Sequence, residues 1–231
     1  MSGADALPLV RADDVSKTFG SGERAVVAVH DLTRSVAPGA RIAVTGPSGS
    51  GKSTLVHLFA GLETPTTGTI TWPGLTTGQA RPAHQIGLVF QGPSLLPPLS
   101  VLENVALPLV LQGMAEAEAH ELAHEALRDL DMDALAAKLP EEISGGQAQR
   151  VAIARVVATK PRLIMADEPT GQLDHSTAEH VVEVLIEAAD RIGAALVIAT
   201  HDLLVVQRLP NRWLVRDGNV MTMTPAAGAL S

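Results

Sequence analysis

Eight consecutive residues have the spacing of a phosphate-binding loop, G-x-x-x-x-G-K-[ST]: Gly46-Pro47-Ser48-Gly49-Ser50-Gly51-Lys52-Ser53. Glycine has no Cβ atom, so successive backbone N–H groups of such a loop can curl around an anion. Lys52 supplies a positive charge for the outer phosphates, and the hydroxyl of Ser53 is placed to ligate Mg²⁺. The motif predicts a nucleoside triphosphate site, to which we add the next residue, Thr54. A surface loop rich in glycine and serine is the alternative.

The residues on either side of this loop predict the local structure that the motif needs. Residues 41–45 form a short apolar run that predicts a buried strand. From Lys52 to Leu62, apolar residues recur on one face of a helix, and Gly61 lies near its end. A helix that starts at the loop would add its dipole and its unpaired N–H groups to the anion site.

Polar residues follow three further apolar runs, each of which predicts a strand. These residues are Gln91, Asp167, Glu168 and His201. Continuous apolar runs are typical of strands buried on both faces of a parallel sheet, and ligands bind beyond the carboxyl ends of such strands. We therefore expect these side chains to converge on the phosphates held by residues 46–53.

Each of the four side chains has a chemical role in that setting. Asp167 suits the Mg²⁺ shell, through water, and Glu168 can orient or deprotonate the attacking water. The amide oxygen of Gln91 can reach the metal or that water, and His201 can donate a hydrogen bond to the γ-phosphate. The alternatives are a helix-start cap for the two acids, a solvated loop residue for Gln91, and an exposed or internally bonded histidine for His201.

A second glycine-rich turn, Ser144-Gly145-Gly146-Gln147, opens a helix predicted from Gln147 to Ala158. A helix N-terminus of this kind is ready to bind an anion. The turn follows no predicted strand, so a phosphate bound there need not be held by the same chain. A head-to-tail dimer would let each chain's turn close the other chain's site, and an ordinary helix cap is the alternative.

The composition limits the class of protein. The chain has 231 residues, of which 46% are hydrophobic, and this fits one large α/β domain or one domain with a subdomain. Absence of cysteine excludes disulfides and thiolate metal sites, and the net charge of −8 argues against broad nucleic-acid binding. The N-terminal residues lack a signal-peptide pattern, and no apolar run approaches the length of a membrane span. We expect a cytosolic protein with no direct membrane insertion, unless a partner holds it to a membrane.

The order of the predicted elements gives the domain organisation. Residues 7–15 and 25–36 predict antiparallel strands ahead of the phosphate-loop strand. From about residue 92 the chain is acidic and helix-forming, which predicts a helical insert in an α/β domain. We expect the core and an N-terminal antiparallel β subdomain at about 1–91 and 159–231, and the helical subdomain at about 92–158.

Short patterns predict where several elements begin and end. Asp133 is expected to cap a short helix that ends before Pro140. Ser176 to Glu179 has the pattern of a capping box, at the start of a helix that Gly193 ends. Asp217-Gly218 predicts a hairpin turn.

One further motif points to different chemistry. Residues 120–124, His-Glu-Leu-Ala-His, fit the H-E-x-x-H pattern of zinc proteases. A catalytic zinc also needs a third protein ligand and a second shell, and no later motif supplies one recognisably. Context therefore favours the phosphate site over a metalloprotease.

Taken together, these motifs resemble those of the ATP-binding-cassette (ABC) ATPases. Residues 143–147, Ile-Ser-Gly-Gly-Gln, are similar to the family's signature motif, with Ile in place of the usual Leu. Residues 163–170 resemble its Walker B segment, and residues 171–174, Gly-Gln-Leu-Asp, resemble its D-loop. Gln91 matches the Q-loop and His201 the switch histidine. The resemblance covers nearly the whole chain, in the family's order and spacing.

The resemblance implies a P-loop NTPase (RecA-like) core that binds ATP and Mg²⁺. It implies a cytosolic subunit that forms a head-to-tail homodimer around two ATP molecules, with Ser144 and Gly146 contacting the partner's ATP. An aromatic residue near the N-terminus stacks on adenine in this family, and Phe19 matches that position. The implied nucleotide-binding set also includes Gly145, Gln147 and Asp174, and the implied metal set is Ser53, Gln91 and Asp167.

Within the family, residues 90–105 and 166–171 resemble the lipoprotein-release and macrolide-efflux branch. This implies the ATPase subunit of a membrane transporter, held at the inner face of the cell membrane by a permease. We expect a permease helix to dock on the surface around Gln91, Leu95, Leu96 and Val101. One alternative is a non-transporting relative of the cell-division type, which relays ATP state to a membrane partner. Another is a soluble DNA-repair or translation ATPase, which the single cassette, the lack of a coiled-coil insertion and the acidic balance disfavour.

Overall fold

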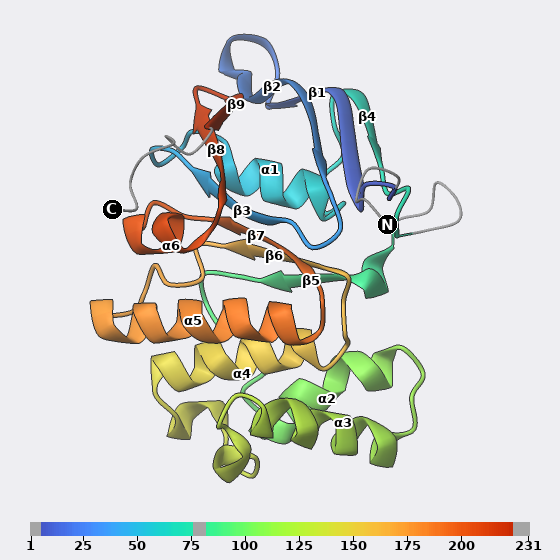
Figure 1. Ribbon diagram of the computed structural model, residues 1–231, viewed down its shortest axis with the longest axis vertical. Helices are drawn as coiled ribbons and strands as arrows, with labels where there is room; N and C mark the ends of the chain where they lie inside the picture. Colours follow the sequence, from blue (N-terminus) through green and yellow to red (C-terminus); the bar gives the residue numbers. More distant parts are fainter. Residues whose placement is uncertain (1–5, 76–81, 224–231) are drawn as a thin grey trace. The chain divides into compact units, whose positions relative to one another are not determined.

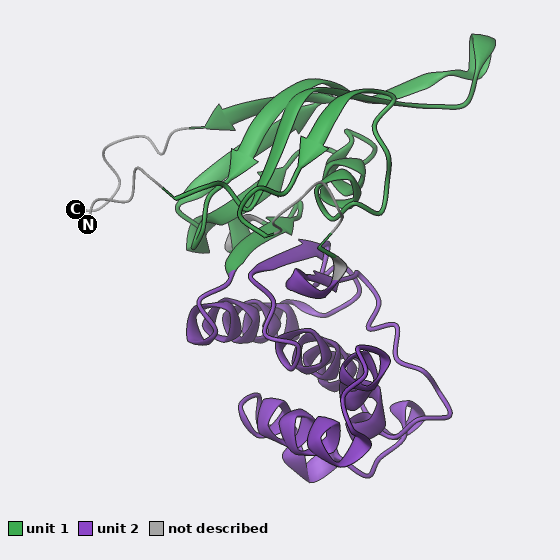
Figure 2. Cartoon of the chain, turned by 90° about the vertical axis from the view of Figure 1, so that its right-hand side faces the viewer, with its two compact units in different colours: residues 1–83, 195–231 green, residues 84–194 purple. Residues whose placement is uncertain are grey.

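The computed structural model describes residues 6–75 and 82–223, which contain both helices and strands (Figure 1). The chain divides into two compact units, coloured separately in Figure 2. The first unit comprises Met1–Ala83 and Ala195–Ser231, and the second comprises His84–Ala194. The segment predicted as a helical insert, about 92–158, lies within the second unit, together with strands from both sides of it.

A three-stranded antiparallel sheet forms one part of the first unit, in the order β2-β1-β4. Its strands are β1 (Val10–Phe19), β2 (Val26–Val36) and β4 (Thr67–Thr71). The 3-10 turn Gly22–Arg24 joins β1 to β2, and the register pairs Phe19 with Val26. The predicted antiparallel pairing is confirmed, although β1 continues past the predicted end at Val15 to Phe19.

Four more strands of the first unit pair in the order β7-β3-β8-β9. They are β3 (Arg41–Thr45), β7 (Ala195–Ala199), β8 (Asn211–Arg216) and β9 (Asn219–Met223). β3 runs parallel to both of its neighbours, β7 and β8, and β8 and β9 form an antiparallel hairpin. The helices of this unit are α1 (Lys52–Phe59) and α6 (Leu203–Arg208).

The core of the first unit explains the apolar runs. Every residue of β3 and β7 is buried except Arg41, which is half-buried, so these strands face water on neither side. α1 adds the buried side chains of Leu55, Leu58 and Phe59. The Phe59 ring meets Trp213 of β8 edge to face, with 5.9 Å between the ring centroids. The parallel strands predicted from continuous apolar runs are confirmed here.

The predicted hairpin turn is also confirmed. Asp217 and Gly218 join β8 to β9, with φ angles of 49° and 74°. Positive φ at both central residues matches the right-handed twist of the flanking strands, which explains why Asp-Gly is a strong signal for this turn.

The second unit contains a parallel strand pair and four longer helices. Its main elements are β5 (Ile86–Val89), β6 (Leu163–Asp167), α2 (Val101–Leu111), α3 (Glu116–Arg128), α4 (Gly145–Val157) and α5 (His175–Arg191). It also contains the 3-10 turns η3 (Asp133–Leu135) and η4 (Pro140–Glu142), and the turn η2 (Ala83–Gln85) spans the boundary between the two units. β5 and β6 pair in parallel. α4 contacts α2, α3 and α5, so it is the central helix of this unit (Figure 1).

The short helix expected after Asp133 is replaced by a single 3-10 turn. Met132 precedes that turn and no side chain caps it. The carboxylate of Asp133 instead contacts the ring of His124, with 3.0 Å between Oδ1 and Nδ1. The prediction of a capped helix at Asp133 was therefore wrong, because this carboxylate is engaged by another helix.

The predicted start of α5 was also wrong. The residue at the N-cap is Asp174 rather than Ser176. Asp174 Oδ1 accepts a hydrogen bond from the Thr177 N–H at 3.1 Å and another from the Ser176 hydroxyl at 2.8 Å. At the other end, Gly193 follows the helix with a φ of +66° and its N–H donates to Asp190 O, which confirms the predicted stop.

Candidate nucleotide-binding site

The phosphate loop, residues 46–53, connects β3 to α1 and includes the first two residues of that helix, as the motif predicts. Two of its glycines are required by close backbone contacts. A Cβ atom on Gly46 would lie 2.1 Å from Val215 O, and one on Gly51 would lie 2.1 Å from Ala28 O. Gly51 also has a φ of +106° and occupies the N-cap of α1. Gly51 has no side chain to cap the helix, and the start of α1 is the positive end of the helix dipole, which suits an anion.

The ammonium group of Lys52 is folded over the phosphate loop. Lys52 is buried, and its Nζ donates hydrogen bonds to Gly46 O at 3.0 Å and Pro47 O at 3.2 Å. A phosphate in the loop would offer charged oxygens in place of these neutral carbonyls, so the Lys52 ammonium would form an ion pair as well as hydrogen bonds. The hydroxyl-bearing Ser53 is exposed in the first turn of α1, and Thr54 follows it. Hydroxyl and carboxylate oxygens suit Mg²⁺, so the residue types fit the implied metal.

The outer side of the phosphate loop is held by residues that the sequence did not single out for this role. The Gly218 N–H donates to Ser50 O at 3.1 Å, and the His30 N–H donates to Gly218 O at 2.9 Å. Together with the close approaches of Val215 O and Ala28 O, these bonds place β2, β8 and the β8–β9 turn directly against the loop. Asp217-Gly218 signalled a hairpin, but no local pattern showed which loop that hairpin would support.

His201 follows β7 and is exposed. β7 pairs in parallel with β3, with Ala199 opposite Val44, and the Thr200 N–H donates to Val44 O at 2.9 Å. The carboxyl ends of β3 and β7 therefore meet at one edge, where the phosphate loop and His201 begin. The structure thus brings His201 and the phosphate loop to the same edge of the parallel strands.

Gln91, Asp167 and Glu168 belong to the second unit, where the structure brings them to one edge as well. β5 and β6 are parallel, with Val89 opposite Ala166, so both strands end on the same side. The Gln91 side chain lies against Gly171, where a Cβ atom would come within 2.9 Å of Nε2. Glu168 has a left-handed φ of 46°, which is uncommon for a residue other than glycine. Their predicted convergence on phosphates remains a prediction.

The second glycine-rich turn forms the N-terminus of α4. Ser144 is the N-cap: its Oγ accepts from the Gln147 N–H at 3.3 Å, and Gln147 Oε1 accepts from the Ser144 N–H at 2.8 Å. This capping box has the geometry of the helix-cap alternative. It leaves the N–H groups of Gly145 and Gly146 in the first turn, where intrahelical partners are lacking.

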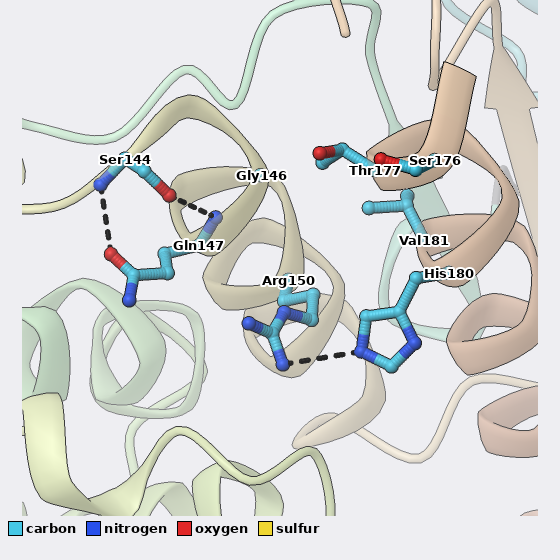
Figure 3. A pocket seen from close by; sticks show the side chains of 8 residues that line it. All are labelled: Ser144, Gly146, Gln147, Arg150, Ser176, Thr177, His180 and Val181. Carbon is cyan, nitrogen blue, oxygen red and sulfur yellow. Dashed lines mark hydrogen bonds between the residues drawn. The ribbon is translucent and has the colours of Figure 1, made fainter. Parts of the chain in front are cut away.

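A pocket of about 290 Å³ lies between the first turns of α4 and α5 (Figure 3). Its lining consists of Ser144, Gly146, Gln147, Arg150, Ser176, Thr177, His180 and Val181. The Arg150 guanidinium is 3.4 Å from Nε2 of His180. A Cβ atom on Gly146 would lie 2.3 Å from Thr177 Cγ2, so glycine is what lets the two helices approach here.

Asp174 lies at the start of α5, beside this pocket. The Thr177 hydroxyl donates to its carboxylate, and so do the Ser176 hydroxyl and the Thr177 N–H. These bonds favour the charged form and lower the pKa of Asp174 to about 2. The carboxylate is therefore ionised at neutral pH.

Phe19 is the last residue of β1, the middle strand of the antiparallel sheet in the first unit. Its side chain is 42% exposed, which leaves ring surface for a flat ligand. The ammonium of Lys17 lies 4.9 Å from the ring centroid. Lys17 could not be singled out from the sequence, because a lysine in a strand looks like any solvated residue.

The family-model comparison matches residues 29–171 to the family described as ABC transporter. This chain belongs to the ABC transporter ATPases. Across 95% of the cassette, it is 33% identical to the ATP-binding cassette MJ0796, a bacterial ABC transporter cassette, and covers all of that chain with a TM-score of 0.83. The MJ0796 structures are dimeric, and one is a post-hydrolysis state bound to ADP and Pi. A second similar structure is CbiO1 of Clostridium perfringens, part of the CbiONQ transporter complex, with 27% identity, a TM-score of 0.80 and coverage of 93% of the cassette and 87% of CbiO1.

The comparisons confirm the predicted family, the cassette fold and the ATPase activity.

Two further findings concern the described part of the cassette. Within residues 6–75 and 82–223, no helix combines the length and apolar character needed to cross a bilayer. Within the same ranges no group of three or more His, Asp or Glu side chains is placed to hold a metal by itself, and His124 of the H-E-x-x-H pattern pairs with Asp133.

Proposed function

We propose that this cassette powers a membrane transporter of the efflux or lipoprotein-release type through ATP-driven head-to-tail dimerisation. The observation that supports this most directly is the 33% identity to dimeric MJ0796 over nearly the whole chain. The glycine-rich turn at the N-terminus of α4, which suits an anion without belonging to the phosphate loop, is consistent with a second chain supplying part of each site.

In this proposal the phosphate loop and Thr54 hold the ATP phosphates, with Lys52 against the outer ones. Ser53, Asp167 and Gln91 supply oxygens to Mg²⁺, directly or through water. A Mg²⁺ ion held by these oxygens would supply positive charge to the phosphates during transfer. Glu168 orients and deprotonates the attacking water, and His201 donates a hydrogen bond to the γ-phosphate.

The signature turn and the D-loop act on the nucleotide of the other chain. Ser144, Gly145, Gly146 and Gln147 form the helix start that meets the partner's ATP, and Asp174 lies at the same interface. The N–H groups of Gly145 and Gly146 suit an anionic γ-phosphate, because they lie at the positive end of α4. ATP binding then closes the dimer, and hydrolysis removes the group that bridges the two chains.

A permease would hold the cassette at the inner face of the cell membrane. The segment after Gln91 supports this, because its Leu96 is 44% exposed. The buried amide of Asn104 fixes that loop: its Oδ1 accepts from the Leu96 N–H at 2.7 Å, and its Nδ2 donates to Leu99 O at 2.9 Å. A rigidly presented apolar side chain is suited to a partner helix.

One residue of the predicted docking surface needs correction. Val101 is fully buried, because it is the first residue of α2 and faces the helical core. The proposed surface therefore consists of Gln91, Leu95 and Leu96.

The decisive experiment uses Glu168→Gln, which keeps the size of the side chain but removes the base. We expect ATP binding and an ATP-dependent dimer in size-exclusion chromatography with light scattering, with turnover reduced roughly 10²–10⁴-fold. Near-normal turnover would show that Glu168 is not the base. A protein that stays monomeric at saturating ATP would contradict the dimer mechanism.

The membrane partner is tested separately. Affinity capture of the tagged Glu168→Gln variant with ATP from solubilised membranes should retain an integral membrane protein, and adding Leu96→Asp to this variant should release it. Leu96→Asp alone, in the parent protein, should leave ATPase activity normal. Capture of a partner that moves no substrate in reconstituted vesicles would favour the cell-division type of relay.

A further inference from the structure

The Lys17 side chain lies beside Phe19 and is largely shielded from solvent. The two residues are two apart in β1, so their side chains leave the strand on the same face. The Lys17 side chain is only 14% exposed, and its Nζ lies 2.7 Å from Glu63 Oε2 and 2.9 Å from Thr64 O. The same ammonium is 4.9 Å from the Phe19 ring centroid.

Glu63 and Thr64 connect this pair to the helix that starts at the phosphate loop. They follow α1, and the Glu63 N–H donates to His57 O in the last turn of that helix. Two bonds fasten the same segment to β1: the Thr66 N–H donates to Ser16 O at 2.8 Å, and Thr66 Oγ1 accepts from the Thr18 N–H at 3.0 Å. The end of β1 is therefore fixed to the segment that leaves α1, within the first unit.

The position of Lys17 restrains the Phe19 ring. A cation within about 6 Å of a ring centroid is attracted to the ring face, more strongly when it is shielded from water. Glu63 and Thr64 O keep Lys17 from moving away, so the ring is held on one side while its other surface stays exposed. A ring that is ordered before its ligand arrives loses less conformational freedom on binding.

We propose that Lys17, anchored by Glu63, is a positioning residue for the nucleotide base. It holds Phe19 in the orientation in which a purine stacks on the ring's open face. This rests on the proposed stacking of adenine on Phe19. Lys17 itself touches neither the base nor the phosphates in this proposal, so its effect is confined to nucleotides that carry a base.

The test is Lys17→Met, which keeps the length of the side chain and removes the charge. We expect the KM for ATP to rise about 3–10-fold with kcat unchanged, as expected when one side chain must be ordered on binding. Inhibition by inorganic tripolyphosphate, which has phosphates but no base, should be unaffected. Lys17→Arg should restore the KM because it returns a cation to the ring face. Lys138→Met removes a more exposed Lys–Glu pair, Lys138–Glu142, and should leave the KM unchanged.

The Phe19→Ala variant tests adenine stacking on Phe19 separately from the positioning role of Lys17. If Phe19→Ala leaves the KM for ATP unchanged, the proposed stacking fails, and the role of Lys17 fails with it. If Phe19→Ala raises the KM but Lys17→Met does not, only the role of Lys17 is overturned. Equal weakening of ATP and tripolyphosphate by Lys17→Met would also overturn it, because the effect would then reach the phosphates. Should Lys17→Met lower the melting temperature sharply, Glu63→Gln tests the same anchor and should raise the KM in the same selective way.

Discussion

Asp174 is the residue whose chemistry is most clearly set by its neighbours. Three hydrogen bonds from Ser176 and Thr177 hold its pKa at about 2, below the usual 3.8. A carboxylate whose pKa is depressed by folding stabilises the fold above the unfolded pKa, and this contribution is lost as the pH falls through the folded value. The stabilisation is therefore fully present above about pH 4 and disappears towards pH 2.

We predict that Asp174→Asn lowers the melting temperature at pH 7, because asparagine keeps the helix cap but not the charge. The difference from the parent protein should narrow steadily between pH 4 and pH 2, measured by differential scanning calorimetry. Thr177→Val removes the largest single contribution and should raise the pKa of Asp174 in an NMR titration. A difference in melting temperature that stays constant between pH 4 and pH 2 would contradict the low pKa of Asp174.

For single residues, the catalytic and binding side chains were easier to predict than the residues that hold them in place. Lys52, Glu168 and His201 could be found because each sits at a fixed place in a motif or at the end of an apolar run. Lys17 could not, since its partner Thr64 lies 47 residues further along the chain, next to Glu63, and tertiary packing brings both to Lys17.

At the scale of elements, the phosphate loop is shaped by strands that flank it in space. Val215 O of β8 and Ala28 O of β2 occupy the places that Cβ atoms of Gly46 and Gly51 would need, and the β8–β9 turn bonds to Ser50 O. Gly46 and Gly51 thus allow close contact with the flanking strands, and the loop leads directly into the positive end of α1.

We predict that Gly218→Ala disturbs ATP binding through this turn. Gly218 has a φ of +74°, and an added Cβ atom would lie 2.7 Å from His30 Cδ2 and 3.2 Å from Ala28 O. Gly39→Ala is the matched control, with a φ of +69° and nothing within 4 Å of the new atom. Both changes should cost about 1–2 kcal/mol of stability for the left-handed backbone, but only Gly218→Ala should also raise the KM for ATP.

Equal KM values for the two glycine variants would show that the turn does not position the loop. The double variant His30→Ala with Gly218→Ala should recover part of the affinity, because it removes the nearer of the two contacts. Denaturant-induced unfolding gives the loss of stability of each variant, and steady-state kinetics on the same preparations give its KM for ATP.

Element boundaries show where local patterns mislead. Both Asp174 and Ser176 carry the right side chain for the start of α5, and the pattern Ser176 to Glu179 favoured the second. The structure selects Asp174 because its carboxylate collects three donors at once. Asp133 failed as a cap for the opposite reason: its carboxylate is turned to His124. Competing polar partners in space, which a local pattern does not contain, decided both cases.

For the whole molecule, the central prediction is that no single chain contains a complete catalytic site. The predicted family, fold and ATPase activity follow from motifs spread over nearly the whole chain, which is why they could be predicted together. The assembly needs a direct test, because the capping box at Ser144 satisfies the helix start within one chain and is compatible with either role.

Mixing two inactive variants provides that test. Lys52→Ala removes the phosphate-loop charge. Ser144→Asp keeps a good helix cap and places a negative charge where the partner's γ-phosphate is proposed to bind. In a head-to-tail heterodimer of the two, one site combines an intact phosphate loop from the Ser144→Asp chain with an intact turn from the Lys52→Ala chain. Random mixing makes half of the dimers mixed, each with one good site, so roughly a quarter of the parent ATPase activity should return. Ser144→Asn, a neutral cap, should be far less impaired than Ser144→Asp. If each chain closed its own site, both sites of the mixed dimer would be broken and the mixture would stay inactive.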